Sequence, residues 1–155
     1  KAAVGAMLDA LLPCATVLTP NLPEAGVLLG ERAPENLKEM RRAAERLRER
    51  MTHAGARWVV LKGGHLSHGD AIDLVTDGDR MIELALPRVA TKNTHGTGCT
   101  LSAAIAALLP QSPDVPTAIR RAKDYLAGAL AAADRLDVGR GHGPVHHFHA
   151  LWREA

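Results

Sequence analysis

Residues 94–109 read THGTGCTLSAAIAALL, a polar loop with two glycines that leads directly into a segment rich in alanine and leucine. Free backbone N–H groups at a helix start, together with the helix dipole, attract anions, and glycine lets a phosphate approach the backbone closely. The loop 94–98 therefore predicts a phosphate site, and an ordinary glycine-containing helix start explains it equally well. It is not a Walker A loop, because no Gly-Lys-Ser/Thr closes it, and it is not a GxGxxG fingerprint, because only one of the required glycine spacings is present. From its composition, we expect the helix 99–109 to be buried on all sides.

Outward from this loop, the chain alternates helical and strand patterns, which is typical of an α/β layer structure. Asp77-Gly78, at the turn between two strand patterns, is a strong hairpin signal. Residues 19–23 read TPNLP, which predicts a proline-bounded loop after a buried strand. Helical patterns cover residues 2–12, 35–53, 99–109 and 116–136, and strand patterns cover residues 15–18, 58–61, 71–76 and 81–86.

The composition excludes several classes of protein. With 155 residues, 46% of them apolar and 23% charged, the chain is too rich in core residues to be disordered. Its formal net charge of +2 is spread along the chain, which argues against a nucleic-acid partner. No stretch reaches the roughly 18 uninterrupted apolar residues of a membrane span, so no membrane association is expected and a cytoplasmic location is the default. The two cysteines, Cys14 and Cys99, are expected to be free thiols.

Two side chains next to these elements could take part in chemistry. Cys99 stands in the first turn of the helix after the glycine loop, where the dipole favours a thiolate. The alternative is that Cys99 is a small buried hydrophobic residue. Lys62 follows the buried strand 58–61, at the carboxyl end where open α/β sheets place ligand-contacting groups. Its ammonium group could neutralise phosphate charge, or it could simply be solvated.

Oxygen ligands and histidines raise the question of a metal. Asn21 and Glu24, at the spacing Asn-x-x-Glu, could hold a hydrated magnesium ion. The spacing alone favours the other interpretation, in which Glu24 is the first-turn acid of a short helix. The tail contains four histidines, but no cysteine or acidic residue lies among them to complete a zinc site, so packing or lining of a crevice is the preferred interpretation. These histidines are His142, His146, His147 and His149.

Four segments are distinctive as a set: LTPNLPEA at 18–25, LKGGH at 61–65, TKNTHGTGCTLSAA at 91–104 and GHGPVHHFH at 141–149. Together they resemble the hydroxymethylpyrimidine/phosphomethylpyrimidine kinases, which are ribokinase-like enzymes of thiamine biosynthesis. The resemblance implies a three-layer α/β fold with a mostly parallel central sheet flanked by helices. It also implies that ATP phosphorylates 4-amino-5-hydroxymethyl-2-methylpyrimidine, and then its monophosphate to the diphosphate.

The same resemblance implies roles for individual residues. The anion hole that holds the transferring phosphate corresponds to Gly96, Thr97 and Gly98, with Thr94 beside the ATP phosphates. Cys99 occupies the position where most ribokinase-like sugar kinases carry an aspartate base. Lys62 matches a lysine that offsets charge in the transition state, and Asn21 and Glu24 match the element that supports Mg²⁺, largely indirectly. The implied cofactors are ATP and Mg²⁺, the implied substrate is a small pyrimidine, and the complete enzyme is expected to be a homodimer.

One departure from the family limits these expectations. Members of the family begin with strands and a glycine-bearing loop that grip the pyrimidine, and nothing in this chain matches that half. Residues 1–155 are therefore expected to be the C-terminal, ATP-side part of a single kinase domain. Two other functions remain open: a pyridoxal-type vitamin kinase with the same phosphate loop, and a non-catalytic remnant that only binds nucleotide.

Overall fold

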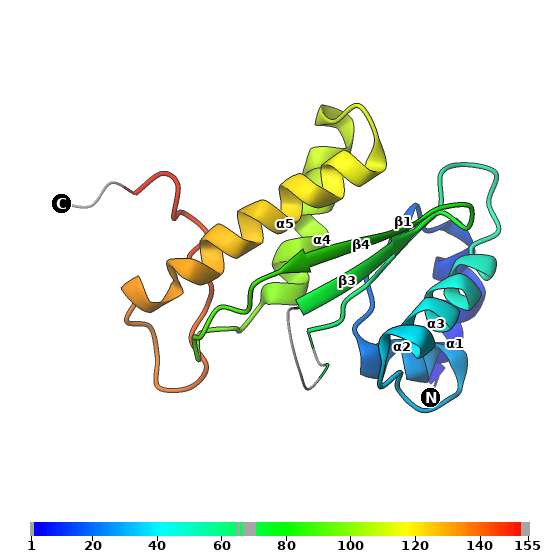
Figure 1. Cartoon of the computed structure of the whole chain (residues 1–155), viewed down its shortest axis with the longest axis horizontal. Coiled ribbons are helices and arrows are strands. Elements are labelled where there is room, and N and C mark those ends of the chain that lie inside the picture. The colour runs from blue at the N-terminus through cyan, green and yellow to red at the C-terminus, as the bar shows by residue number, and fades with distance from the viewer. Residues whose placement is uncertain (1, 65, 67–70, 153–155) are drawn as a thin grey trace. The chain divides into compact units, whose positions relative to one another are not determined.

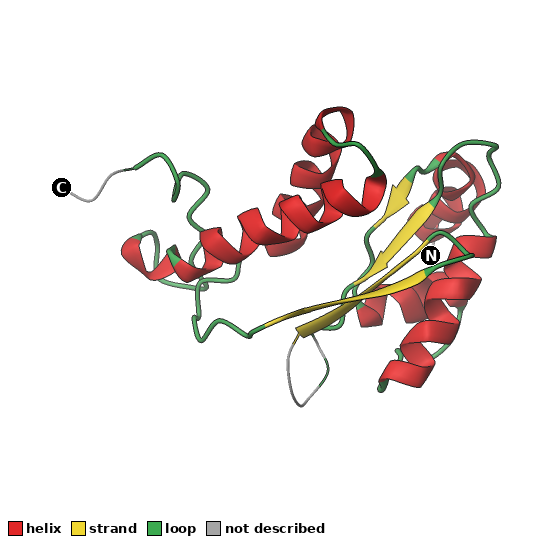
Figure 2. Cartoon of the chain, turned by 45° about the horizontal axis from the view of Figure 1, so that its top comes forward, coloured by secondary structure: helices red, strands yellow, loops and turns green. Residues whose placement is uncertain are grey.

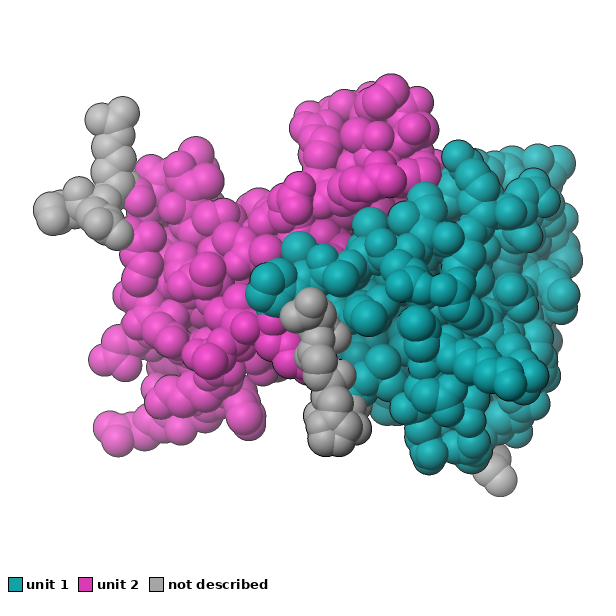
Figure 3. Space-filling view, in the orientation of Figure 1, with its two compact units in different colours: residues 1–87 teal, residues 88–155 magenta. Residues whose placement is uncertain are grey.

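The computed structural model describes residues 2–64, 66 and 71–152. The chain forms two compact units, residues 1–87 and residues 88–155, which are coloured separately in Figure 3. We refer to them as unit 1 and unit 2. In the described part of the chain, no helix is both long enough and apolar enough to cross a membrane.

The described residues of unit 1 form three helical segments. The first begins as α1, Ala2–Ala6, and continues through a π-helical turn, Met7–Leu11, and a 3-10 turn, Leu12–Cys14, that contains Pro13. The second is α2, Leu22–Leu29, which replaces the second half of the loop predicted at 19–23. It begins there because Pro23 is accommodated in the first turn of a helix, where its missing N–H is not needed. The third is α3, Leu37–Glu49, which is shorter at both ends than the predicted helix 35–53.

The sheet of unit 1 has the strand order β1-β2-β3-β4, with β1 at Val17–Leu18, β2 at Trp58–Leu61, β3 at Ala71–Thr76 and β4 at Met81–Leu86. β1 and β2 are parallel, as expected for the family's sheet. The other two pairings are antiparallel, so the described strands form a mixed sheet. The predicted hairpin joins β3 to β4, and at its turn Gly78 has a φ of 103°, which glycine adopts without strain (Figure 2).

One face of this sheet carries the main core of unit 1, because α3 packs on β2 and β3 and α2 packs against α3 (Figure 1). The apolar positions of α3 lie on one side of the helix, as its sequence periodicity predicts. All four residues of β2 are buried, which confirms the predicted buried strand. The core joins side chains from helices and strands, among them Leu28, Leu29, Met40, Ala44, Leu47, Val59, Leu61 and Leu74.

Unit 2 is a pair of helices with long connecting segments. α4 covers Thr97–Leu108 and α5 covers Val115–Ala131, and the two pack against each other. The side chain of Asp114 caps α5 by accepting the N–H of Thr117 at 2.7 Å. Short 3-10 turns follow the helices at Leu109–Gln111 and Ala133–Arg135.

The prediction that the alanine-rich helix is buried on all sides is wrong for this chain. α4 buries only Thr100, Leu101 and Ile105, whereas other positions, including Ala103 and Ala107, are exposed. Alanine is the best helix former of all residues, so an alanine-rich sequence signals helix stability as much as burial.

Candidate functional site

The carboxyl ends of β1 and β2 bring the first group of candidate residues together. The N–H of Lys62 donates to the carbonyl oxygen of Pro20 at 2.9 Å, and Asn21 and Lys62 form an isolated parallel bridge. This main-chain pairing continues the parallel register of the two strands for one step beyond their ends. Asn21 and Lys62 are therefore neighbours, and Glu24 lies in the first turn of the adjoining α2. No described acidic side chain forms an ion pair with Lys62.

Asn21 and Glu24 form a capping box at the start of α2. Oδ1 of Asn21 accepts the N–H of Glu24 at 2.8 Å, and Oε2 of Glu24 accepts the N–H of Asn21 at 2.7 Å. The Asn-x-x-Glu spacing thus has a complete structural explanation. A carboxylate offers about four lone-pair sites and Glu24 is exposed, so it keeps capacity for a water of a hydrated Mg²⁺. The pair fits an indirect magnesium site, and its role in one stays a prediction.

The turn after Lys62 is held by an acid that the sequence analysis did not single out. Asp73, on β3, is buried, and its Oδ1 accepts the N–H of Gly63 at 2.9 Å. A side chain at Gly63 would clash with the carbonyl oxygen of Ile72, so only glycine fits there. The signal available in the sequence was an acid inside the otherwise apolar strand AIDLVT. His65, the last residue of the quoted LKGGH segment, lies outside the described residues.

The predicted phosphate loop lies at the start of α4, in unit 2. The helix begins at Thr97, two residues earlier than predicted, after Gly96 with a φ of 83°. Its first helical hydrogen bond runs from the N–H of Thr100 to the carbonyl oxygen of Gly96 at 2.8 Å. The N–H groups of Gly98 and Cys99 find no acceptor among the described residues. These are the unpaired donors of a helix start, and they can bind an anion.

Cys99 is the third residue of α4 and is exposed, which does not fit the interpretation of Cys99 as a buried hydrophobic residue. The first turn of α4 contains no acidic side chain, so no carboxylate competes with an incoming anion there. Thr94, Gly96, Thr97, Gly98 and Cys99 thus form one continuous segment. The structure groups the predicted residues into two sets, one at the sheet edge in unit 1 and one at the helix start in unit 2.

The phosphate loop also contacts the C-terminal tail. The N–H of His95 donates to the carbonyl oxygen of Gly143 at 3.1 Å, and Asn93 accepts the N–H of Gly143 through Oδ1 at 3.1 Å. Sequence reasoning missed this contact, because its partners are 50 residues apart and no local pattern connects them.

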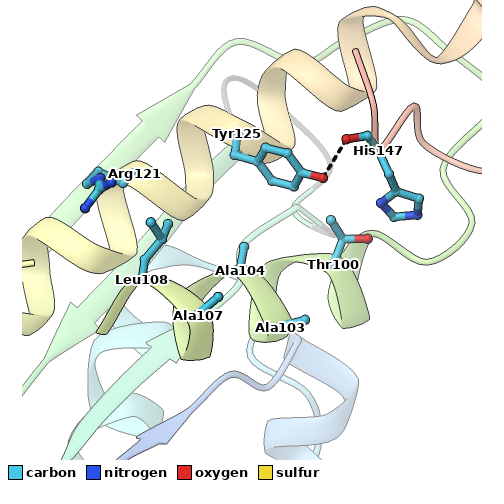
Figure 4. Close-up of a pocket in the computed structure, with 8 residues that line it drawn as sticks. All are labelled: Thr100, Ala103, Ala104, Ala107, Leu108, Arg121, Tyr125 and His147. Carbon is cyan, nitrogen blue, oxygen red and sulfur yellow. Dashed lines mark hydrogen bonds between the residues drawn. The ribbon is translucent and has the colours of Figure 1, made fainter. Parts of the chain in front are cut away.

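A mostly apolar hollow of about 550 Å³ lies within unit 2, between α4, α5 and the tail (Figure 4). The hydroxyl of Tyr125 donates to the carbonyl oxygen of His147 at 2.8 Å and fixes one wall. The hollow begins at Thr100, one residue after Cys99, and its lining suits an apolar or aromatic group. Its lining residues are Thr100, Ala103, Ala104, Ala107, Leu108, Arg121, Tyr125 and His147.

The tail histidines take separate positions in unit 2. Nδ1 of His142 lies 3.1 Å from the carbonyl oxygen of Lys92, and His146 is buried. His147 lines the hollow, and the ring of His149 lies 5.4 Å from that of Tyr125. This placement agrees with the packing and crevice-lining interpretation. Among the described residues, no group of three or more histidine, cysteine or acidic side chains is arranged to hold a metal ion.

Comparison with known sequences identifies close relatives. The profile of the family described as phosphomethylpyrimidine kinase matches residues 1–146. A hydroxymethylpyrimidine/phosphomethylpyrimidine kinase from Rhizobium meliloti strain 1021 is 48% identical over 152 residues, covering 98% of this chain and 56% of the relative. That of Escherichia coli K12 is 44% identical over 150 residues, covering 97% of this chain and 55% of the relative. The chain thus spans about half the length of the curated relatives it matches.

Solved structures give the same fold. The crystal structure of an ADP complex of Bacillus subtilis pyridoxal kinase matches with a TM-score of 0.87 at 34% identity, covering 97% of this chain and 56% of that one. The structure of phosphomethylpyrimidine kinase from Clostridium difficile 630 matches with a TM-score of 0.64 at 29% identity, covering 80% of this chain and 47% of that one. These similarities confirm the predicted α/β, ribokinase-like fold.

Proposed function

The chain belongs to the phosphomethylpyrimidine kinase family, and on that premise we propose that it supplies the ATP- and phosphate-binding side of a kinase domain acting in thiamine biosynthesis. The reaction is phosphorylation of 4-amino-5-hydroxymethyl-2-methylpyrimidine by ATP, followed by phosphorylation of the monophosphate. Residues 1–155 are the C-terminal part of that single domain. We further propose a cytoplasmic homodimer, as the sequence resemblance implies.

The start of α4 is the observation that carries this proposal. The unpaired N–H groups of Gly98 and Cys99, with Gly96 in a left-handed conformation, suit a phosphate whose charge grows during transfer. Donors fixed in advance toward developing charge stabilise a transition state without reorganisation. Phosphoryl transfer depends mostly on such positioning and charge stabilisation. In the proposed reaction, Gly96, Thr97 and Gly98 surround the transferring phosphate, with Thr94 next to it.

Cys99 is the proposed base. The substrate hydroxyl gives its proton to the Cys99 sulfur, and the hydroxyl oxygen forms a bond to the γ-phosphorus. The bond between that phosphorus and the bridging oxygen of ADP breaks, and ADP leaves with the electron pair. The exposure of Cys99 at the helix start supports this assignment, because a base must reach the substrate.

Lys62, Asn21 and Glu24 are proposed to act on the nucleotide phosphates. The ammonium of Lys62 offsets negative charge that develops in the transition state. Glu24 would hold a water of a hydrated Mg²⁺, and Asn21 keeps Glu24 in place through the capping box. Bound Mg²⁺ would supply further charge neutralisation on the ATP phosphates.

The test uses the full-length product of the gene, purified and incubated with ATP, Mg²⁺ and hydroxymethylpyrimidine. Mass spectrometry should detect the monophosphate and then the diphosphate, with a higher kcat/KM than for pyridoxal. A preference for pyridoxal would identify the pyridoxal-type kinase to which the Bacillus subtilis neighbour belongs. Binding of ATP without turnover of either substrate would identify a non-catalytic nucleotide-binding protein.

A matched pair of glycine variants tests the role of the helix start. Gly96→Ala forces a side chain into a left-handed conformation, which costs about 1–2 kcal/mol, and should lower turnover sharply. Gly30→Ala is the control, because Gly30 at the end of α2 is also left-handed. A new methyl group would have open space at both Gly30 and Gly96. Turnover by the two variants, corrected for the folded fraction, should differ by at least about tenfold. Equal turnover would contradict the phosphate role of this loop.

A further inference from the structure

Asn93 occupies an unusual place just ahead of the phosphate loop. Only 7% of its surface is exposed, although it lies in a connecting segment where polar side chains normally face water. Asn93 lies between the end of β4 and the start of α4, outside any helix or strand. A buried amide needs partners for both its oxygen and its nitrogen.

The Asn93 side chain connects three separate segments of unit 2. Oδ1 accepts the N–H of Gly143 in the tail at 3.1 Å. Nδ2 donates to Oδ1 of Asp134, in the 3-10 turn after α5, at 2.8 Å. The hydroxyl of Thr91 donates to the same Asp134 oxygen at 2.5 Å. We call the side chains of Asn93 and Asp134, together with the backbone of Gly143, the loop clamp.

The clamp holds the chain immediately before the phosphate-binding N–H groups. Gly143 forms two hydrogen bonds to this segment. Its N–H donates to Oδ1 of Asn93, and its carbonyl oxygen accepts the N–H of His95. His95 directly precedes Gly96. A side chain at position 143 would clash with Asn93, so glycine is required for this close approach. The chain is therefore held at two residues, Asn93 and His95, within three residues of Gly96.

We propose that Asn93, through Asp134 and Gly143, is a positioning residue that sets the direction of the N–H groups at the start of α4. Asn93 does not itself touch the phosphate in this scheme. It acts on turnover because the N–H groups stabilise developing charge only when they are held in place. The part of this inference that concerns turnover rests on the kinase function proposed above, whereas the part that concerns order in the loop does not.

The decisive variants exchange the two side chains of the clamp. Asn93→Asp places a second carboxylate beside Asp134 and removes the donor between them. Adding Asp134→Asn restores the hydrogen bond with its direction reversed, because the amide now at 134 donates to the carboxylate now at 93. That carboxylate also still accepts the N–H of Gly143. If the loop clamp acts as proposed, N93D should loosen the loop and lower kcat, and N93D/D134N should restore both. Such compensation is the signature of a direct interaction in a double-mutant cycle.

Two measurements are made on the full-length protein. Hydrogen–deuterium exchange without nucleotide should be at least about tenfold faster over residues 94–100 in N93D and N93A, and close to the natural rate in N93D/D134N. With ATP and hydroxymethylpyrimidine, kcat should fall about 10–100-fold in N93D and N93A, with a smaller change in KM for ATP. In N93D/D134N, kcat should return to within about threefold of the natural protein.

Asn36→Ala is the matched control, because Asn36 caps α3 in unit 1 through a single hydrogen bond to the N–H of Glu39. It should lower thermal stability while leaving kcat and exchange over residues 94–100 unchanged. Unchanged exchange in both N93A and N93D, or a double variant as impaired as N93D, would overturn the proposal. If N93A does not fold, the comparison of N93D with N93D/D134N decides. Absence of kinase activity in the natural protein, with the exchange pattern as expected, would overturn the proposed function and support the clamp.

Discussion

Lys62 and the phosphate loop are held in place by different means. Lys62 follows a strand, and its backbone is fixed by pairing with Pro20 and Asn21 on the parallel neighbour. Segment 94–99 leads into the first turn of α4, and Asn93, the residue just before it, forms side-chain hydrogen bonds to Asp134 and Gly143, far along the chain. Regular strand pairing fixes a residue through many equivalent backbone bonds, whereas a clamp relies on a few specific groups. Apart from Gly63, where only glycine fits, the sheet edge should therefore tolerate more substitutions than the loop does.

The largest expected effect belongs to Cys99, the side chain in the first turn of α4 that is proposed to accept the substrate's proton. Cys99→Ala and Cys99→Ser should lower kcat about 10²–10⁴-fold, because a positioned base is lost. Cys99→Asp should retain more activity than Cys99→Ala, since a carboxylate can accept the proton. Steady-state kinetics on the full-length protein measure these differences, and thermal unfolding should change little because Cys99 is exposed. Cys14→Ser, at the other exposed free thiol, is the control, and a kcat for C99S equal to that of C14S would remove Cys99 from the mechanism.

At the sheet edge, Lys62→Ala should lower kcat about 10²–10³-fold, with a modest change in the Kd of ATP. The cation is expected to matter most when charge develops in the transition state. Pre-steady-state turnover and ATP titration separate the two quantities. Arg42→Ala removes an exposed cation from α3 and should change neither. An equal loss in kcat and in ATP affinity would instead indicate ordinary ground-state binding by Lys62.

Two adjacent glycines test how firmly the sheet edge is held. Gly63→Ala places a methyl group against the carbonyl oxygen of Ile72 and should destabilise the fold by about 1–3 kcal/mol. Gly64→Ala has open space around the new methyl group and should be close to neutral. Chemical denaturation of the two variants gives the comparison directly. Similar free energies of unfolding would show that the turn after Lys62 adjusts freely, contrary to the close packing observed.

The smallest expected effect concerns the hairpin that carries β3 next to β2. Burial alone would raise the pKa of Asp77, but hydrogen bonds from Arg80 and the N–H of Asp79 outweigh it and lower the pKa below the ordinary value of 3.8. A lowered pKa in the folded state means that Asp77 stabilises the protein at neutral pH. This contribution is lost as the pH falls below about 4. Asp77→Asn should therefore cost about 0.5–1 kcal/mol at pH 7 and less at pH 3, as measured by urea unfolding. A cost that does not depend on pH would contradict the ionic origin of this effect.

Local patterns in the sequence predict the regular elements well. β2, β3 and β4 have the predicted bounds, because alternation, buried runs and the Asp-Gly turn are short-range signals. The loop predicted at 19–23 extends too far, since Pro23 indicates a turn and the first turn of a helix equally well, whereas the interpretation of Glu24 as a first-turn acid is confirmed. The exposed face of α4 was missed because alanine fits both buried and exposed helix positions.

The sequence indicates the residues proposed to contact the ligand, and it does not indicate the residues that hold them in place. Lys62 could be singled out because it directly follows a recognisable strand, and Gly96 because it precedes a recognisable helix. For Asp73 the sequence offers only the weak signal of an acid in an apolar strand, and for Asn93 none, since what distinguishes both is a hydrogen bond to a backbone group of another segment. Contacts over 50 residues leave no trace in local periodicity.

The contact between Asn93 and Gly143 also sets an order of events during synthesis. Translation proceeds from the N-terminus, so the phosphate loop leaves the ribosome well before the tail that secures it. At about 5–20 residues per second, the 50 residues between these partners take about 2.5–10 s to add. We expect the nascent chain to display α4 during that interval with its first turn still unsecured. If the start of α4 binds phosphate as proposed, the nascent chain would bind nucleotide there in its final geometry only after Gly143 has emerged.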